Sequence, residues 1–316
     1  MGIALDSLPD LAGRVYIVTG GNAGIGLETA KVLTQKNARV YIGARSDTKA
    51  QTAISTIQSQ LPKNCTGTTH YLHLDHMNLS TISAGAQAFL AKETSLHGLI
   101  LNAGIMCTPY EISPDGHEAH FQTNYLAHFL LTELLLPLMQ TTARQDDVAV
   151  GSVRLVEVSS AAYIGVGEPG VNFAELDLPR AKPIDRYAQS KLANILHVRE
   201  LHARVGPKGS QAEKGEIWVA VIHPGLVDTN VAASYASTSL LGRTLLRIGF
   251  AAKPEDGASG TIFAAASNSF TREWAGRYIV SPGKKGSLYR QANNVKLQEK
   301  LWKWSEEELA RLGFLT

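Results

Sequence analysis

A glycine-rich turn near the amino terminus constrains the fold of this chain more than any other feature. Residues 14–18 (RVYIV) are rich in β-branched and aromatic side chains, which predicts a short buried strand. The segment TGGNAGIG follows at 19–26, and an apolar helical pattern runs over 24–36. A strand, a glycine turn and a helix in this order are the context in which a dinucleotide-binding fingerprint occurs.

The glycine spacing favours a pyrophosphate at this turn. Gly20 can turn tightly, Gly24 lets the backbone approach a ligand, and Gly26 permits close packing of helix on strand. The helix N-terminus adds unpaired N–H groups and a partial positive charge. The predicted cofactor contacts here are Gly20, Asn22, Gly24, Ile25 and Gly26. The spacing G-x-x-x-G-x-G departs from the commoner G-x-G-x-x-G, so a glycine turn without a ligand remains an alternative.

Strand and helix patterns alternate along the rest of the chain. Strands are expected at 14–18, 39–43, 68–74, 98–101, 153–158, 217–222 and 277–280. Helices are expected at 24–36, 48–60, 79–93, 117–139, 186–205 and 254–267. This alternation predicts an α/β fold: a single Rossmann-type doubly wound domain with a seven-stranded parallel sheet and helices on both faces. One domain spans 1–316, with a core at 11–280, a substrate lid at 226–253 and a C-terminal helical tail at 294–314.

A tyrosine and a lysine lie four residues apart in the expected helix 186–205. At this spacing Tyr187 and Lys191 share one helix face. A neighbouring ammonium favours the phenolate, so Lys191 is expected to lower the pKa of Tyr187 and make it an acid/base. The pair alone is weak evidence, because a solvated helix face gives the same pattern.

Six motifs in order resemble the short-chain dehydrogenase/reductase family. They are TGGNAGIG at 19–26, Asn102-Ala103-Gly104, Asn124 within FQTNYL, Ser159-Ser160, Tyr187-x-x-x-Lys191 and HPGLVDT at 223–229. The resemblance runs over about 11–279. Within the family, the chain is most similar to the group around retinol dehydrogenases and WW-domain oxidoreductases, and to fungal enzymes of secondary metabolism. The gap of 27 positions from Ser160 to Tyr187 belongs to that likeness.

The resemblance implies four catalytic residues. Tyr187 would be the general acid in reduction and the base in oxidation, and Lys191 would lower its pKa and bind the nicotinamide ribose. Ser160 would hold the substrate oxygen, and Asn124 would anchor a water chain from Lys191. The chemistry agrees, because donors placed on the oxygen stabilise the charge that hydride arrival creates.

The end of the second expected strand predicts the cofactor NADP(H). An NAD site usually has an acidic residue there, whereas this chain has Ala44 followed by Arg45. A guanidinium can bind a 2′-phosphate, although Arg45 as a solvated strand end is the alternative. The resemblance adds further cofactor contacts at Asp75, Asn102, Ala103, Gly104, Tyr187, Lys191, Pro224, Gly225, Val227 and Thr229.

The expected substrate is a hydrophobic ketone or aldehyde, or the matching alcohol. The segment after Pro224-Gly225 sets specificity in the family, and residues 231–253 are apolar here. An inserted loop at 161–185 would form a second wall. Two alternatives stay open: an epimerase or C=C reductase on the same site, and a non-catalytic regulatory protein that binds NADP(H).

Composition limits partners and compartment. A net charge of +2 without a basic tract predicts no nucleic-acid partner. Two separated cysteines, Cys65 and Cys107, and no signal-peptide pattern predict a cytoplasmic protein. The tail 294–314 is amphipathic, which predicts packing on the domain and leaves contact with a partner or a membrane surface open. No metal site is predicted, since His117 and His120 are one residue short of zinc-protease spacing. The chain is expected to be a monomer or homodimer.

Overall fold

One eight-stranded sheet runs through the computed structural model, which describes residues 8–225, 227, 252–280 and 284–315. The strand order is β3-β2-β1-β4-β5-β6-β7-β8, and every pairing is parallel except that of β8 with β7. The strands are β1 Val15–Thr19, β2 Arg39–Ala44, β3 Thr68–His73, β4 Gly98–Leu101, β5 Arg154–Val158, β6 Trp218–His223, β7 Tyr278–Val280 and β8 Lys284–Lys285. The expected seven parallel strands are therefore present, and the eighth escaped prediction because it consists of two exposed lysines.

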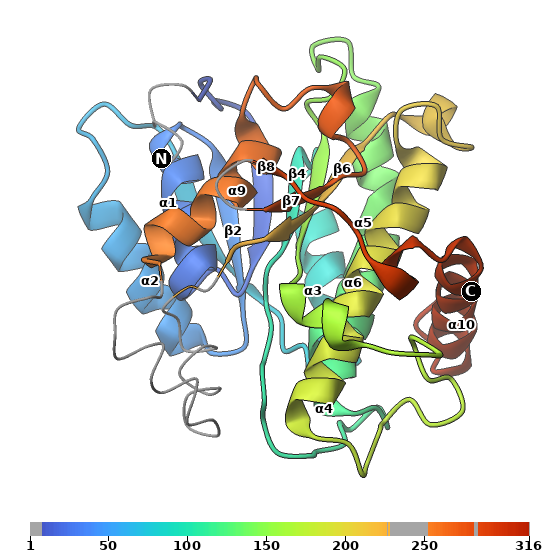
Figure 1. Ribbon diagram of the computed structural model, residues 1–316. Coiled ribbons are helices and arrows are strands. Elements are labelled where there is room, and N and C mark those ends of the chain that lie inside the picture. The colour runs from blue at the N-terminus through green and yellow to red at the C-terminus, as the bar shows by residue number, and fades with distance from the viewer. Residues whose placement is uncertain (1–7, 226, 228–251, 281–283, 316) are drawn as a thin grey trace.

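Helices cover both faces of the sheet (Figure 1). They are α1 Gly24–Gln35, α2 Asp47–Ser59, α3 Leu79–Leu90, α4 Ala119–Phe121, α5 Ala127–Ala143, α6 Pro183–Val205, α9 Pro254–Ala266 and α10 Val295–Arg311. Alternate residues of β1 face opposite cores, with Tyr16 and Val18 toward α1, α2 and α9, and Val15 and Ile17 toward α3, α5 and α6. The period of two in buried strands thus builds the three layers.

The strand order reverses direction at β1. β1 pairs with β2 on one side and with β4 on the other. The connections that leave the carboxyl ends of β1 and β4 therefore run in opposite directions. In open α/β sheets, ligands bind in the crevice at this point. The glycine turn follows β1, and the segment 102–104 follows β4, so both motifs lie at this edge.

The helix expected at 117–139 is interrupted by a wider turn. A single π-helical turn, Gln122–Leu126, separates α4 from α5 and contains Asn124. The expected helix is therefore present over 119–143, but its apolar period could not show the π turn, in which the Asn124 side chain bonds the backbone of Ile105. Turns of this type occur often at functional sites.

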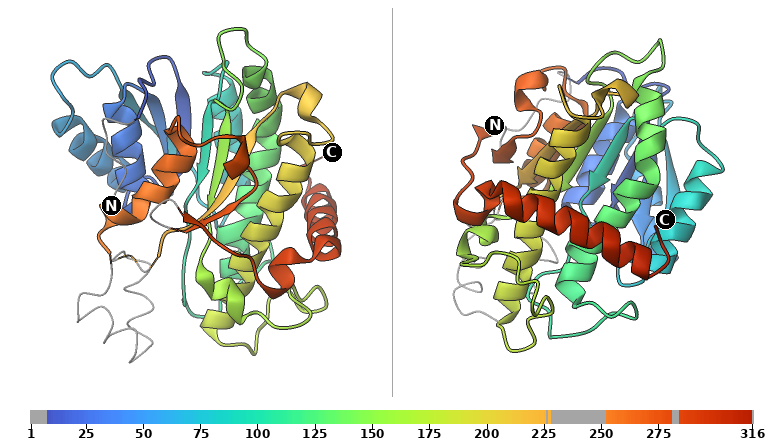
Figure 2. Two further views of the ribbon diagram at one scale, coloured as in Figure 1. Left: turned by 45° about the horizontal axis from the view of Figure 1, so that its top comes forward. Right: turned by 90° about the vertical axis from the view of Figure 1, so that its right-hand side faces the viewer.

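The amphipathic tail forms α10, which packs as an outer layer against α6 and α5 (Figure 2, right). The indole ring of Trp302 contacts the rings of Phe129 and His197, at centroid distances of 4.9 and 5.8 Å. The hydroxyls of Tyr125 and Ser305 are 2.6 Å apart in the buried contact. The expected packing of the tail on the domain is confirmed. Among the described residues, no helix has both the length and the apolar character to span a bilayer.

Candidate active site

Thr19, the last residue of β1, ties the glycine turn to the segment after β4. Its Oγ1 accepts hydrogen bonds from the backbone N–H groups of Asn102 (2.9 Å) and Ala103 (3.0 Å). The Asn102 amide donates back to the carbonyl of Thr19 at 3.0 Å. The two predicted cofactor segments are therefore fastened together by one buried hydroxyl.

His128 extends this contact to the π turn. Its Nδ1 lies 3.1 Å from the carbonyl oxygen of Asn124, which can only accept, so Nδ1 carries the proton. Burial holds the pKa of His128 well below its ordinary value, so the ring is neutral and Nε2 accepts. The Thr19 hydroxyl, 2.9 Å away, then donates to Nε2. A defined hydrogen-bond chain thus links Asn124 to the glycine turn.

The glycine turn leaves no room for side chains at its centre. A Cβ on Gly26 would lie 2.4 Å from the carbonyl oxygen of Gly20, and Gly20 has a φ of +64°. Asn22 and Ile25 are half-buried in the same turn. The tight cradle and the α1 N-terminus fit a dinucleotide pyrophosphate.

The segment after β6 approaches the start of α1. Pro224 and Gly225 follow β6 directly, and buried Val227 pairs with Ala252 in a parallel bridge. A Cβ added to Gly257 would meet both Val227 (2.6 Å) and Ile25 (3.3 Å), which places these two side chains at one spot. Thr229 and nearly all of the expected lid 226–253 lie outside the described residues.

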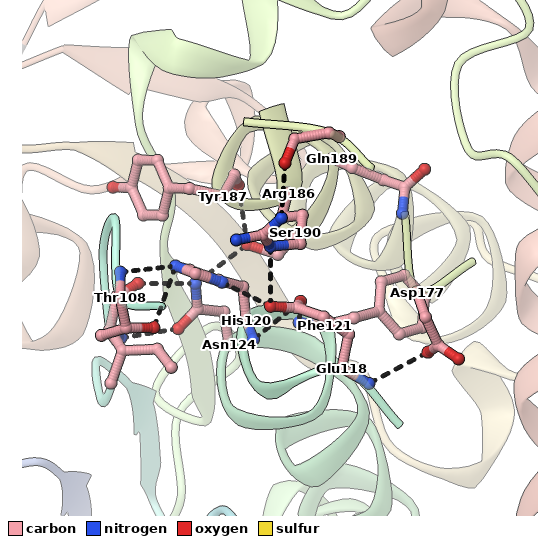
Figure 3. A network of polar contacts seen from close by, with 12 residues as sticks. Thr108, Glu118, His120, Phe121, Asn124, Asp177, Arg186, Tyr187, Gln189 and Ser190 are labelled. Carbon is pink, nitrogen blue, oxygen red and sulfur yellow. Dashed lines mark hydrogen bonds and ion pairs between the residues drawn. The ribbon is translucent and has the colours of Figure 1, made fainter. Parts of the chain in front are cut away.

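Asn124 joins three elements through its side-chain amide (Figure 3). Its Oδ1 accepts from the N–H of Ile105 (2.8 Å), and its Nδ2 donates to the Ile105 carbonyl (3.0 Å) and to the Ser190 hydroxyl (2.9 Å). Gly104 lies beside it, since a Cβ there would be 3.1 Å from Asn124 Oδ1 and 3.7 Å from Lys191 Nζ. The segment 102–104, the π turn and α6 therefore meet at one place.

Tyr187, Lys191 and Ser160 lie together where β5 ends beside α6. Lys191 Nζ donates to the carbonyl of Val158 at 2.8 Å and lies 5.9 Å from the centroid of the Tyr187 ring. The Ser160 side chain lies near the Tyr187 phenol and lowers its pKa. The Ser159 hydroxyl donates instead to the main-chain oxygen of Lys191 at 2.8 Å. The structure thus brings the four predicted catalytic residues into one cluster.

Burial, rather than Lys191, dominates the acidity of the phenol. It raises the pKa of Tyr187 to about 12, partly opposed by the Ser160 side chain. Burial also lowers the pKa of Lys191 to about 8, opposed by the charge of Glu157. In this structure the ammonium is bound to the Val158 carbonyl and burial outweighs the expected effect of Lys191 on the pKa of Tyr187, so that expectation stays a prediction.

A buried carboxylate below Lys191 was missed from the sequence. Glu157 on β5 accepts from His197 Nδ1 at 2.8 Å and from the amide of Asn194. Asn194 also donates to the Asn124 carbonyl at 2.7 Å. The only signal in the sequence was a single glutamate inside the apolar strand RLVEV. Because alternate residues of a strand face opposite sides, the pattern could not show whether this glutamate is buried or exposed to solvent.

Arg45 and Asp75 follow β2 and β3 at the same edge of the sheet. Gly43 pairs in register with Thr19, so exposed Arg45 lies close to the glycine turn. Asp75 is half-buried, and its carboxylate accepts from the N–H of Met77. The described residues contain no group of three or more side chains able to hold a metal ion.

Known proteins share this sequence pattern and this architecture. The family model for short chain dehydrogenase matches residues 14–165. The short-chain dehydrogenase/reductase drtF of Aspergillus calidoustus is 44% identical over 98% of each chain. Mouse retinol dehydrogenase 12 is 35% identical, covering 95% of this chain and 87% of that protein. A solved structure of an uncharacterized Mycobacterium paratuberculosis protein superposes with a TM-score of 0.72 at 27% identity, covering 98% of both chains.

Proposed function

Because the chain belongs to the short-chain dehydrogenase/reductase family, we propose that it interconverts a hydrophobic ketone or aldehyde and its alcohol with NADP(H). The cluster of Tyr187, Lys191, Ser160 and Asn124 at the carboxyl edge of the sheet carries this proposal. When bound, NADP(H) supplies or accepts the hydride. The glycine turn 20–26 and the segment 102–104 would hold it, since Gly26 packs tightly against the Gly20 carbonyl and the turn leads into the N-terminus of α1, whose unpaired N–H groups favour a phosphate.

Tyr187 is the proposed proton donor. With a pKa of about 12 the phenol is protonated at neutral pH, which supports its role as the acid in carbonyl reduction. The neighbouring Ser160 hydroxyl would hold the carbonyl oxygen and orient it toward the phenol. Lys191, with a pKa near 8, is protonated in most molecules at pH 7 and would stabilise the phenolate that remains.

Phenylalanine at position 187 tests this role directly. Tyr187→Phe should abolish NADPH oxidation in a screen of apolar ketones, aldehydes and quinones, while NADPH still quenches or shifts the protein fluorescence on binding. The name of the retinol dehydrogenase relative supports including retinal-type aldehydes in the screen. Unchanged turnover of every substrate by Tyr187→Phe would refute the mechanism.

Isotope transfer separates the alternative reactions. Deuterium from 4-deuterated NADPH should appear on the former carbonyl carbon of the product. Deuterium on a former alkene carbon, now saturated, would indicate a C=C reductase. Inversion at a carbon without incorporation of deuterium would indicate an epimerase. Binding of NADPH without turnover of any substrate would favour the regulatory alternative. The fungal relative drtF supports the expected likeness to fungal enzymes of this family.

Arg45 is the proposed NADP(H) determinant. Its exposed guanidinium follows β2, and no ion pair within the described residues occupies it, so it is available for the 2′-phosphate. Arg45→Ala should raise the KM for NADPH far more than the KM for NADH. Arg144→Ala is a matched control, because this exposed arginine follows the C-terminus of α5, away from the glycine turn. Equal effects on both cofactors would refute the assignment.

A further inference from the structure

Glu118 lies at the centre of a buried polar network beside the candidate catalytic cluster (Figure 3). Its carboxylate is 1% exposed. One oxygen contacts Nδ1 of His120 at 2.7 Å and Nε of Arg186 at 3.3 Å. The other accepts from the backbone N–H groups of His120 (2.9 Å) and Phe121 (3.1 Å). The carboxylate therefore accepts three hydrogen bonds, from His120 Nδ1 and the two backbone N–H groups, and forms an ion pair with the Arg186 guanidinium.

The network holds three segments that bear candidate site residues. Glu118 caps the start of the helical segment whose π turn contains Asn124. Arg186, which it pairs with, directly precedes Tyr187 in α6. The N–H of Glu118 itself donates to Asp177 at 3.0 Å, in the loop that leads into α6. One side chain thus sets the π turn against the N-terminal end of α6.

His120 carries the same network to the loop that follows Gly104. The N–H of Thr108 donates to Nε2 of His120 at 3.3 Å, so Nε2 has no proton and Nδ1–H must donate to Glu118. The His120 ring lies 6.4 Å from the ring of Tyr187, edge to face. Cys107, next to Thr108, is buried with a φ of +53°, and burial raises the pKa of its thiol to about 11. The loop wall beside the phenol is therefore fixed through His120.

We propose that Glu118 is a positioning residue that holds Tyr187 in register with Asn124 and with the 105–108 loop, through Arg186 and His120. The inference rests on the proposed function, in which Tyr187 is the reacting group. Glu118 does not touch the phenol; it acts through the residue before it and through the ring beside it. Small displacements of a proton donor reduce turnover strongly, because the reacting atoms must be aligned.

The isosteric amide distinguishes positioning from simple packing. In Glu118→Gln the side chain keeps its size but loses its charge. Its NH₂ group must face a hydrogen-bond donor or the Arg186 guanidinium, because three partners donate hydrogen bonds and the fourth is a cation. Glu93→Gln is the matched control. The Glu93 carboxylate also binds only donors, Arg39 Nη1 (2.9 and 3.0 Å) and Tyr41 Oη (2.7 Å), at a site on β2 far from Tyr187 in the sheet.

The test combines NMR and kinetics on the full chain. Proteins are labelled with 13Cζ-tyrosine, and the Tyr187 resonance is assigned by its loss in Tyr187→Phe. We expect Glu118→Gln to shift this resonance and to lower kcat by about 10-fold or more, with an unchanged dissociation constant for NADPH. Glu93→Gln should leave the Tyr187 resonance, kcat and the dissociation constant for NADPH unchanged.

An unshifted Tyr187 resonance, or a kcat within twofold of wild type, would overturn the inference. If Glu118→Gln does not fold, Arg186→Lys is measured in the same way and judged by the same outcomes. This substitution keeps the positive charge but loses the geometry of the guanidinium. Full turnover by Tyr187→Phe would instead overturn the proposed function, and the resonance shift would still decide whether Glu118 positions the phenol.

Discussion

Removing the Thr19 hydroxyl should loosen the joint between the glycine turn and the 102–104 segment. Thr19→Val keeps the shape of the side chain and removes Oγ1. Two backbone N–H groups, those of Asn102 and Ala103, then lose their acceptor, and Nε2 of His128 loses its donor. The substitution therefore leaves three polar groups without partners.

The size of the effect follows from this count. An unsatisfied buried polar group costs about 1–3 kcal/mol, and Asn102 and Ala103 are only half-buried, so water offsets part of the loss. We expect a loss of about 3 kcal/mol in the free energy of unfolding. At about 2.1 cal/mol/K per residue, 316 residues give an unfolding entropy near 0.7 kcal/mol/K, so Tm should fall by about 4–5 °C.

Thermal unfolding by calorimetry measures this shift, with NADPH binding followed by fluorescence on the same samples. Thr34→Val is the matched control, because the buried Thr34 hydroxyl only donates to the Ala30 carbonyl within α1. Affinity for NADPH should also fall in Thr19→Val, since the turn and the 102–104 segment would no longer be fastened. A melting point within 1 °C of the Thr34→Val value would refute the reasoning.

Three further outcomes are expected. Ser305→Ala should lower the free energy of unfolding in urea by about 1–3 kcal/mol, because it leaves the buried Tyr125 hydroxyl unpaired; Tyr125→Phe should lower it less, and the reverse order would contradict this. Gly26→Ala should abolish NADPH binding measured by fluorescence, since the methyl group would lie 2.4 Å from the carbonyl oxygen of Gly20. Burial lowers the pKa of His76 from 6.5 to about 4, so the unfolded state takes up the proton first and stability falls as the pH drops from 6.5 to 4. The stability difference between wild type and His76→Gln, from urea unfolding, should therefore decline by about 2–3 kcal/mol over this range, and a constant difference would contradict it.

The strand pattern and the motif spacing were enough to predict the seven parallel strands and the edge where the site lies. Each motif directly follows a strand or lies on a helix with a clear apolar period, and parallel strands bring their carboxyl ends to one edge. The meeting of Tyr187, Ser160 and Asn124 follows from that geometry. The local sequence is therefore sufficient to predict those site residues that lie at or directly after the end of a strand.

The remaining parts of the site depend on contacts between distant segments. Within the π turn the Asn124 amide bonds both backbone groups of Ile105, nineteen residues earlier, and the local sequence does not show this contact. Glu118 and Glu157 look like solvated charges in the sequence, and only the fold supplies their buried donors. The raised pKa of Tyr187 likewise reflects burial, which the spacing to Lys191 does not report.

The outer position of α10 limits which sequences α5 can tolerate. Six consecutive residues of α5, 127–132, are buried, because the sheet lies under the helix and α10 lies over it. A helix against a sheet ordinarily keeps one face for solvent and there accepts almost any polar residue. This stretch has no such face, so saturation mutagenesis should find it nearly intolerant at every position, whereas the outward half of α2 accepts wide variation. We therefore expect few tolerated substitutions in the first two turns of the helix that follows the candidate asparagine.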